Sequence, residues 1–149
     1  MAAKPFPTRL VIDRLTSTIP RTELEQVNSA AQYASIEKLS DFRALTTFVL
    51  LANERWDGEP PKAGRQRMIV NFGVVTAVKN FRDTRKGVES AEELDPLIER
   101  IRQQLIGWKP ALEGSRECAL IDGNVLDFDA NVLLWIDVYQ TQHFIGGGA

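Results

Sequence analysis

The acidic residues in the last third of the chain are the side chains best placed to carry a reaction. Asp122, Asp127 and Asp129 lie within eight residues of one another. Carboxylates in such a group could hold two divalent cations for phosphodiester hydrolysis, so a small metal-dependent nuclease is one hypothesis. Asp is also a favoured turn residue, and this accounts for Asp127 and Asp129 without any metal.

The same segment does not match a calcium-binding loop. Asp127, Asp129 and Asn131 occupy the first, third and fifth positions of an EF-hand-like loop. The sixth position needs glycine for a sharp turn and the twelfth needs glutamate, but they are Val132 and Val138. We therefore expect no calcium site here.

The chain has one histidine, His143, and one cysteine, Cys118. Structural zinc needs four N or S ligands, and a nucleophile needs a base that a third group orients. We expect His143 to be exposed at the end of the last strand and inert. A lone cysteine forms no internal disulfide, as is usual in a reducing compartment. Phosphate-binding glycine motifs are absent from the sequence, so a nucleotide phosphate has no obvious cradle.

Two segments of the sequence carry opposite charge. Residues 62–86 hold seven basic residues and one acidic residue, while residues 113–137 hold six acidic and one basic. The whole chain has a net charge of −2, which disfavours a dedicated DNA-binding protein. Two solvated hairpin ends would explain the segments, and so would head-to-tail contact between copies, which closes into rings. The candidate interface residues are Arg65, Arg67, Lys79, Arg82, Arg85, Lys86, Asp122, Asp127 and Asp129.

The composition is that of one compact domain. The chain has 149 residues, of which 44% are hydrophobic and 26% charged. Its apolar runs are far shorter than the roughly 18 residues of a membrane span, so we expect no membrane contact. We predict a single domain over residues 1–145 and a flexible tail over residues 146–149, which are rich in glycine.

Hydrophobic periodicity predicts the elements that would position these residues. Apolar residues at helical spacing favour helices over 5–19, 30–39 and 90–105. Pro96 requires the last of these helices to kink there or to begin at Asp95. For residues 23–29 a short strand and a loop remain alternatives. Strands are predicted over residues 46–52, 65–81, 116–128 and 132–144.

The strand over residues 65–81 has the most regular pattern. Every second residue from Met68 to Val78 is predicted to face one side of the sheet, and the other side is mixed. Gly73 is the expected place for a bend or bulge. A loop is predicted over residues 53–64, with Trp56 and Asp57 as candidate partner-docking residues. Together the elements predict an α+β fold, a mostly antiparallel sheet of about four strands with two to three helices on one face.

Several of these features occur together in one known family. They are the apolar strand 46–52, the loop rich in glycine and proline, the long strand that follows it, and a helix that ends at Leu105. The most specific are the run from Gly107 to Pro110 and the hairpin from Leu126 to Trp135. In this combination the chain resembles the tail terminator proteins of long-tailed bacteriophages.

The resemblance implies a structural role. A terminator subunit would form a ring, usually a hexamer, on the head-proximal end of the tail tube, where it ends tube polymerisation and provides the surface for head–tail joining. It would have no enzymatic activity and no cofactor. The implied partners are further copies, the tail tube protein, a connector or neck protein, and a sheath protein if the tail contracts. DNA would only pass through the ring. The implied location is the virion tail, after assembly in the host cytoplasm. The alternative to a terminator is another head–tail connector protein.

Overall fold

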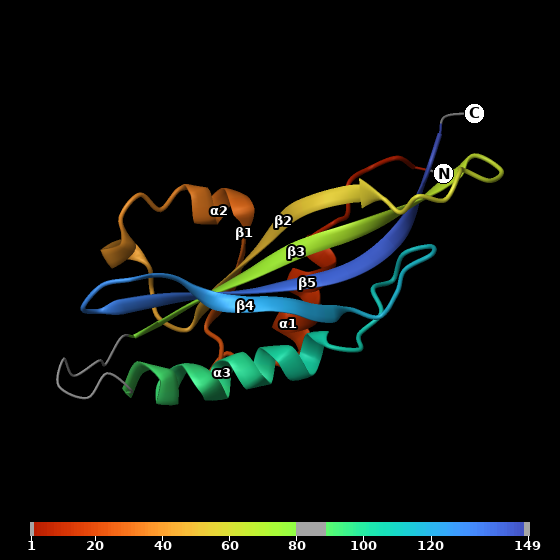
Figure 1. Cartoon of the computed structure of the whole chain (residues 1–149). Helices are drawn as coiled ribbons and strands as arrows, with labels where there is room; N and C mark the ends of the chain where they lie inside the picture. Colours follow the sequence, from red (N-terminus) through yellow and green to blue (C-terminus); the bar gives the residue numbers. More distant parts are fainter. Residues whose placement is uncertain (1, 80–88, 148–149) are drawn as a thin grey trace.

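The computed structural model describes residues 2–79 and 89–147, which form a sheet with helices packed against it (Figure 1). The sheet has five strands in the order β1-β2-β3-β5-β4. β1 runs parallel to β2, and all other neighbouring pairs are antiparallel. The strands are β1 (Gln26–Ser29), β2 (Thr46–Trp56), β3 (Arg65–Lys79), β4 (Ala119–Phe128) and β5 (Val132–Gly146). The predicted α+β class is therefore confirmed, and the fifth strand, β1, falls where a strand and a loop were alternatives.

β3 lies at the centre of the sheet and follows the predicted alternation. Val70, Phe72 and Val74 are buried on one face. Val75 and Ala77 are buried on the other face. Because both faces of β3 are covered, the second face is not purely polar, which explains its mixed sequence.

Two helices cover one face of the sheet. They are α1 (Arg9–Thr18) and α3 (Glu89–Leu105), and their residues Val11, Leu15, Ile101 and Leu105 are buried against the strands. α3 begins before Asp95 and continues through Pro96, so the proposed start at Asp95 is wrong. The helix ends at Leu105, as predicted, and Gly107 follows it with a φ of 83°, which glycine readily adopts.

The opposite face is covered by a short segment. α2 (Ala30–Ala34) and the 3-10 turn η1 (Leu39–Asp41) stand where one helix over 30–39 was expected. From this segment Tyr33 and Phe42 pack their rings against Phe48 of β2. The helices thus lie on two faces rather than one, because apolar residues such as Phe48 also need cover from water.

The predicted loop over residues 53–64 is shorter in the structure. β2 continues to Trp56, and its register against β3 shifts between Leu51 and Asn53. The irregularity predicted at Gly73 of β3 therefore lies in the neighbouring strand β2, between Leu51 and Asn53. Gly73 itself keeps regular register, where a Cβ would come within 3.1 Å of a side-chain atom of Ile136. A two-residue turn then leads into β3, with positive φ at both Ala63 and Gly64, as in type I′ hairpins.

The last two strands form the predicted hairpin. At its turn the Asp129 carboxylate accepts hydrogen bonds from the backbone of Asn131 and Val132. At the other end of β5 the amide of Gly146 donates to the carbonyl of Ala2. The two ends of the chain therefore lie at the same end of the sheet (Figure 1).

Candidate functional site

The three candidate acids lie along the outer strand and its turn. Asp122 and Asp127 are exposed on β4 and bond to backbone or side-chain groups close to them in sequence. Asp129 holds the turn. Within residues 2–79 and 89–147, no group of three or more His, Cys, Asp or Glu side chains is placed to hold a metal ion. The geometry gives the nuclease hypothesis no support in this part of the chain.

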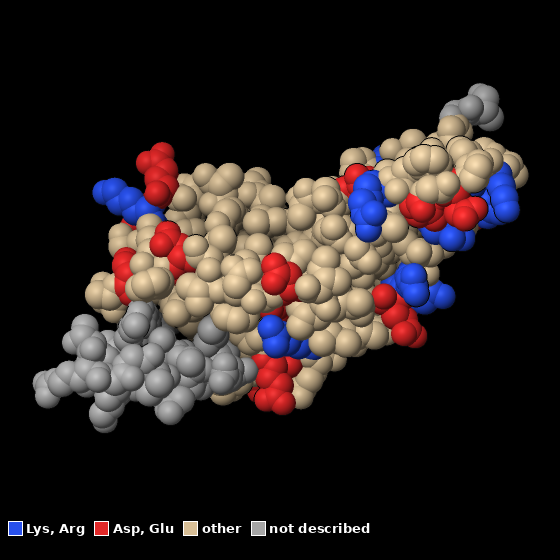
Figure 2. Space-filling view, in the orientation of Figure 1, with Lys and Arg blue, Asp and Glu red and all other residues tan. Residues whose placement is uncertain are grey.

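The candidate bases are spread along β3. Arg65 and Arg67 lie at its start and Lys79 at its end, about 45 Å apart at the usual rise of a strand. Arg82, Arg85 and Lys86 lie outside the described residues. The basic residues that are described therefore do not form a single surface, and most of those visible in Figure 2 lie towards the end that holds the β2–β3 turn.

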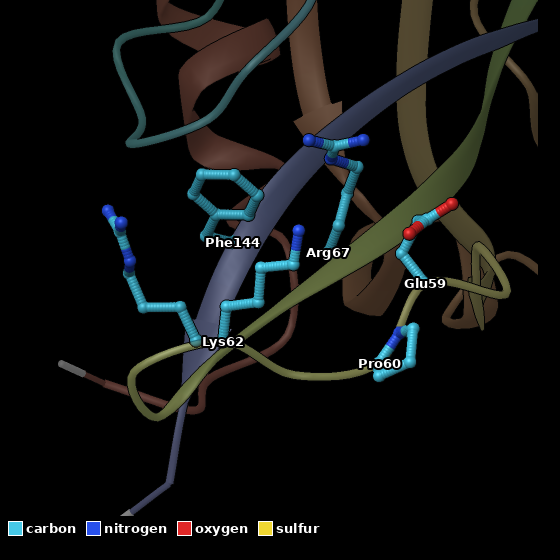
Figure 3. A pocket seen from close by; sticks show the side chains of 6 residues that line it. Glu59, Pro60, Lys62, Arg67 and Phe144 are labelled. Atoms are coloured by element: carbon cyan, nitrogen blue, oxygen red, sulfur yellow. The ribbon is translucent and has the colours of Figure 1, made fainter.

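Arg65 and Arg67 line a hollow at that end of the sheet (Figure 3). Both guanidinium groups lie 5.4 Å from the ring centroid of Phe144. Arg65 is paired with Glu113 at 2.6 Å and Arg67 with Asp57 at 3.5 Å. The full lining is Glu59, Pro60, Lys62, Arg65, Arg67 and Phe144.

The hollow offers one unused hydrogen-bond donor but no group for bond-breaking chemistry. Its two arginines already face carboxylates, so their charges are largely compensated. The Nε of Arg67 is buried and has no hydrogen-bond partner among the described residues, which leaves one donor for a small acceptor. No residue in the lining is a nucleophile with an oriented base.

The two candidate docking residues differ in exposure. Trp56 is 53% exposed and ends β2, and its indole N–H donates to the Glu59 carbonyl. The Asp57 side chain is only 9% exposed. Its carboxylate accepts a hydrogen bond from the backbone N–H of Glu59 and faces Arg67. Asp57 therefore stabilises the conformation of this loop.

The expectation that His143 is exposed is wrong. Its side chain is buried, and Nε2 lies 2.8 Å from Oε1 of Glu54. The same oxygen accepts the backbone N–H of Phe6 at 2.6 Å. This histidine therefore ties β5, β2 and the N-terminal segment together. Sequence reasoning missed the contact because 89 residues separate His143 from Glu54.

Cys118 is buried just before β4, and its backbone pairs with residues 107 and 108 after α3. Burial raises the pKa of the thiol to about 11, and a hydrogen bond with Thr141 opposes this rise only in part. The neutral thiol is therefore the form present at ordinary pH, and the cysteine has no nucleophilic role.

We expect iodoacetamide to alkylate Cys118 very slowly in the folded protein. The raised pKa alone lowers the thiolate fraction near neutral pH by about 100-fold, and burial slows access further. Mass spectrometry of native and urea-unfolded protein measures the two rates at this single cysteine. Equal rates would show that the thiol is open to solvent.

The most unusual surface of the molecule is the outer strand β4. It forms one edge of the sheet and has neither lysine nor proline, the residues that commonly protect such edges. The large hydrophobic residues that are exposed among the described residues are Leu51, Trp56, Ile106, Ile121, Val125, Leu126 and Phe128. Four of these seven lie on β4. An exposed apolar edge of this kind is typical of an assembly surface.

Sequence reasoning did not single out this apolar surface, although a signal was present. The segment from Ala119 to Phe128 has apolar residues without strict alternation, so they cannot all turn towards the core. The register against β5 also shifts twice, after Leu120 and after Val125, and this leaves Ile121 and Leu126 unpaired.

A model of the phage tail terminator protein family matches residues 1–149. The chain belongs to this family. The terminator chain is therefore a structural component of a phage tail and not an enzyme, as the resemblance predicted. No helix in the described part of this terminator is long and apolar enough to cross a membrane.

Other comparisons add little to the family assignment of this terminator. A search of curated proteins found no match. Among solved structures, the terminator chain is similar to the type 4 fimbrial biogenesis protein PilO from Pseudomonas aeruginosa, with 7% identity and a TM-score of 0.25. That similarity covers 66% of this chain and 58% of the PilO chain, so less than two thirds of the PilO chain is spanned.

Proposed function

We propose that this protein forms a ring that closes the head-proximal end of the tail tube. In this role it ends tube polymerisation and presents the surface to which the head is joined. The match to the tail terminator family over residues 1–149 carries the proposal. The exposed apolar edge β4 supports it, because a subunit that stays alone in water would gain nothing from such an edge.

The ring would be built from heterologous contacts, in which one surface of a subunit meets a different surface of the next. Contacts of this kind close into rings when the rotation between subunits allows it. The opposite charges of residues 62–86 and 113–137 would favour such contacts where they are not already paired within one subunit, as Arg65 is with Glu113. We expect a hexamer, through which DNA passes without specific recognition.

The two faces of the ring would have different partners. One face meets the tail tube protein, and the other meets a connector or neck protein; a sheath protein is a further partner if the tail contracts. The β2–β3 end, with exposed Trp56 and the hollow next to it, is a surface suited to docking on a neighbouring ring. Trp is enriched where protein surfaces meet.

The proposal predicts a closed oligomer and capped tubes. We expect light scattering over a concentration series to give a species near six subunits, alone or with tail tube protein. Electron microscopy of tail tubes mixed with the protein should show an added ring at one end. Uncapped tubes together with a monomer under all conditions would contradict the proposed function.

The charge contribution to ring closure has its own test. Reversing Arg82, Arg85 and Lys86 to glutamate should weaken the oligomer, and added salt should weaken the wild-type oligomer. The matched control reverses three exposed lysines outside the basic segment: Lys4, Lys38 and Lys109. If both triple variants assemble like wild type, the basic segment has no part in closure.

A further inference from the structure

The sheet has a second open edge besides β4. β1 pairs only with Thr46 to Val49 of β2. On the same side of β2, residues 50–56 have no strand partner among the described residues. Leu51 and Trp56 are exposed along this stretch, at 37% and 53%. The free half of β2, defined as residues 50–56, is thus an open edge with two exposed large hydrophobic residues, on the opposite side of the sheet from β4.

The two edges are complementary in charge as well as in hydrophobicity. β4 bears Asp122 and Asp127, which are exposed and take part in no ion pair within residues 2–79 and 89–147. The free half of β2 bears Arg55, which is also exposed and without an ion pair in the described part of the chain. Each edge therefore has unmatched charge of the sign that the other lacks.

We propose that β4 of one subunit packs against the free half of β2 in the next copy. This inference rests on the proposed function, since it names the surfaces that join the ring. The occupant is a second copy because one chain carries both halves of a matching pair of surfaces. As the edges lie on opposite sides of the sheet, the contact repeats head to tail and can close.

Side chains rather than a long hydrogen-bonded ladder form this contact. The bulges of β4 at Ile121 and Leu126, and the register shift of β2 at Ala52, leave only short regular runs on either edge. Val125 and Phe128 on one edge, and Leu51 and Trp56 on the other, are the apolar residues that the contact would cover. Asp127 would lie near Arg55.

Cysteine crosslinking tests the pairing of the edges. A chain with both Leu51→Cys and Val125→Cys, treated with a short bismaleimide, should give a ladder that ends at the closed ring. An equimolar mixture of the two single variants should stop at dimers. Wild type is the control for buried Cys118. The reactions are run in solution and again on tail tubes capped by the variants.

The outcomes separate this inference from the proposed function. Dimers from Val125→Cys alone would show that β4 meets β4, which overturns the pairing. Capped tubes without any crosslinked ladder also overturn it, while the proposed function stands. Failure both to cap tubes and to crosslink would remove both proposals together.

A charge swap provides a second readout. Arg55→Asp or Asp127→Arg alone should weaken association about tenfold, because each places like charges in contact. The double variant should recover most of the loss. Arg21→Asp, an equal charge change at an exposed residue outside β4 and the free half of β2, should assemble like wild type. Absence of any recovery in the double variant contradicts the contact between Arg55 and Asp127.

Discussion

Replacing Phe6 with alanine should lower the free energy of unfolding by about 3 to 5 kcal/mol, the usual range for a buried phenylalanine. Phe6 is only 3% exposed although it lies outside any helix or strand. Its ring stacks on Phe72 of β3 with centroids 5.7 Å apart and meets His143 edge-on at 5.9 Å. Its backbone N–H donates to Glu54. Without the ring, the segment before α1 loses its apolar anchor.

Urea unfolding followed by tryptophan fluorescence measures this loss. Phe6→Leu is the matched control, since it keeps an apolar side chain and should recover much of the stability. Glu54→Gln should have a smaller effect, because it keeps an oxygen to accept the bond to Phe6. A loss below about 1 kcal/mol for Phe6→Ala would show that the N-terminal segment is not part of the core.

Replacing Asp137 with alanine should lower the free energy of unfolding by about 3 kcal/mol. The carboxylate is 2% exposed, and Arg102 of α3 donates to both of its oxygens at 2.8 Å. The indole N–H of Trp135 also donates to it, at 2.8 Å. Alanine leaves the guanidinium and the indole without this partner. Arg102 is one-third exposed, so water reaches the freed charge and the loss stays at the lower end of the range for buried pairs.

A double-mutant cycle isolates the pair. Arg102→Met alone leaves a buried carboxylate and should also destabilise the protein strongly. The variant with both Arg102→Met and Asp137→Ala should be more stable than the sum of the two single losses predicts, because no unpaired charge remains. Strictly additive losses would show that the two residues act independently.

The parts of the fold that were predicted from sequence are those set by local pattern. The alternation from Met68 to Val78 identified β3, and the Asp129 turn identified the β4–β5 hairpin. Gly107 identified the end of α3. In each case the deciding residues are close in sequence, so the pattern is visible without tertiary structure.

The errors arose where distant residues decide the structure. The end of β2 looked like a loop because its polar run lies at an open edge, where side chains need not alternate. His143 looked exposed because Glu54 and Phe6, which bury it, come from the other end of the chain. The pair of Arg102 and Asp137 joins a helix to a strand 35 residues later, and no spacing rule predicts it.

The candidate interface was predicted from charge alone, and charge did not identify the apolar residues of β4. The sequence indicated two segments of opposite charge, but the structure places the basic residues Arg65 and Lys79 at the two ends of β3. The apolar edge of β4 emerges only when the strand order is known, because β4 then has a single neighbour. The assembly surface proposed above thus depends on topology more than on composition.

The strand order also bears on synthesis and folding. β5 is the last strand of the described chain, yet it lies between β3 and β4 and is the only strand that pairs with β4. A nascent chain that lacks β5 can form the β2–β3 hairpin but cannot fix β4 in place. The proposed joining edge therefore comes into existence only when β5 has been translated. Contacts between distant segments also slow folding. A subunit that lacks β5 has no joining edge, so it remains unable to join a ring.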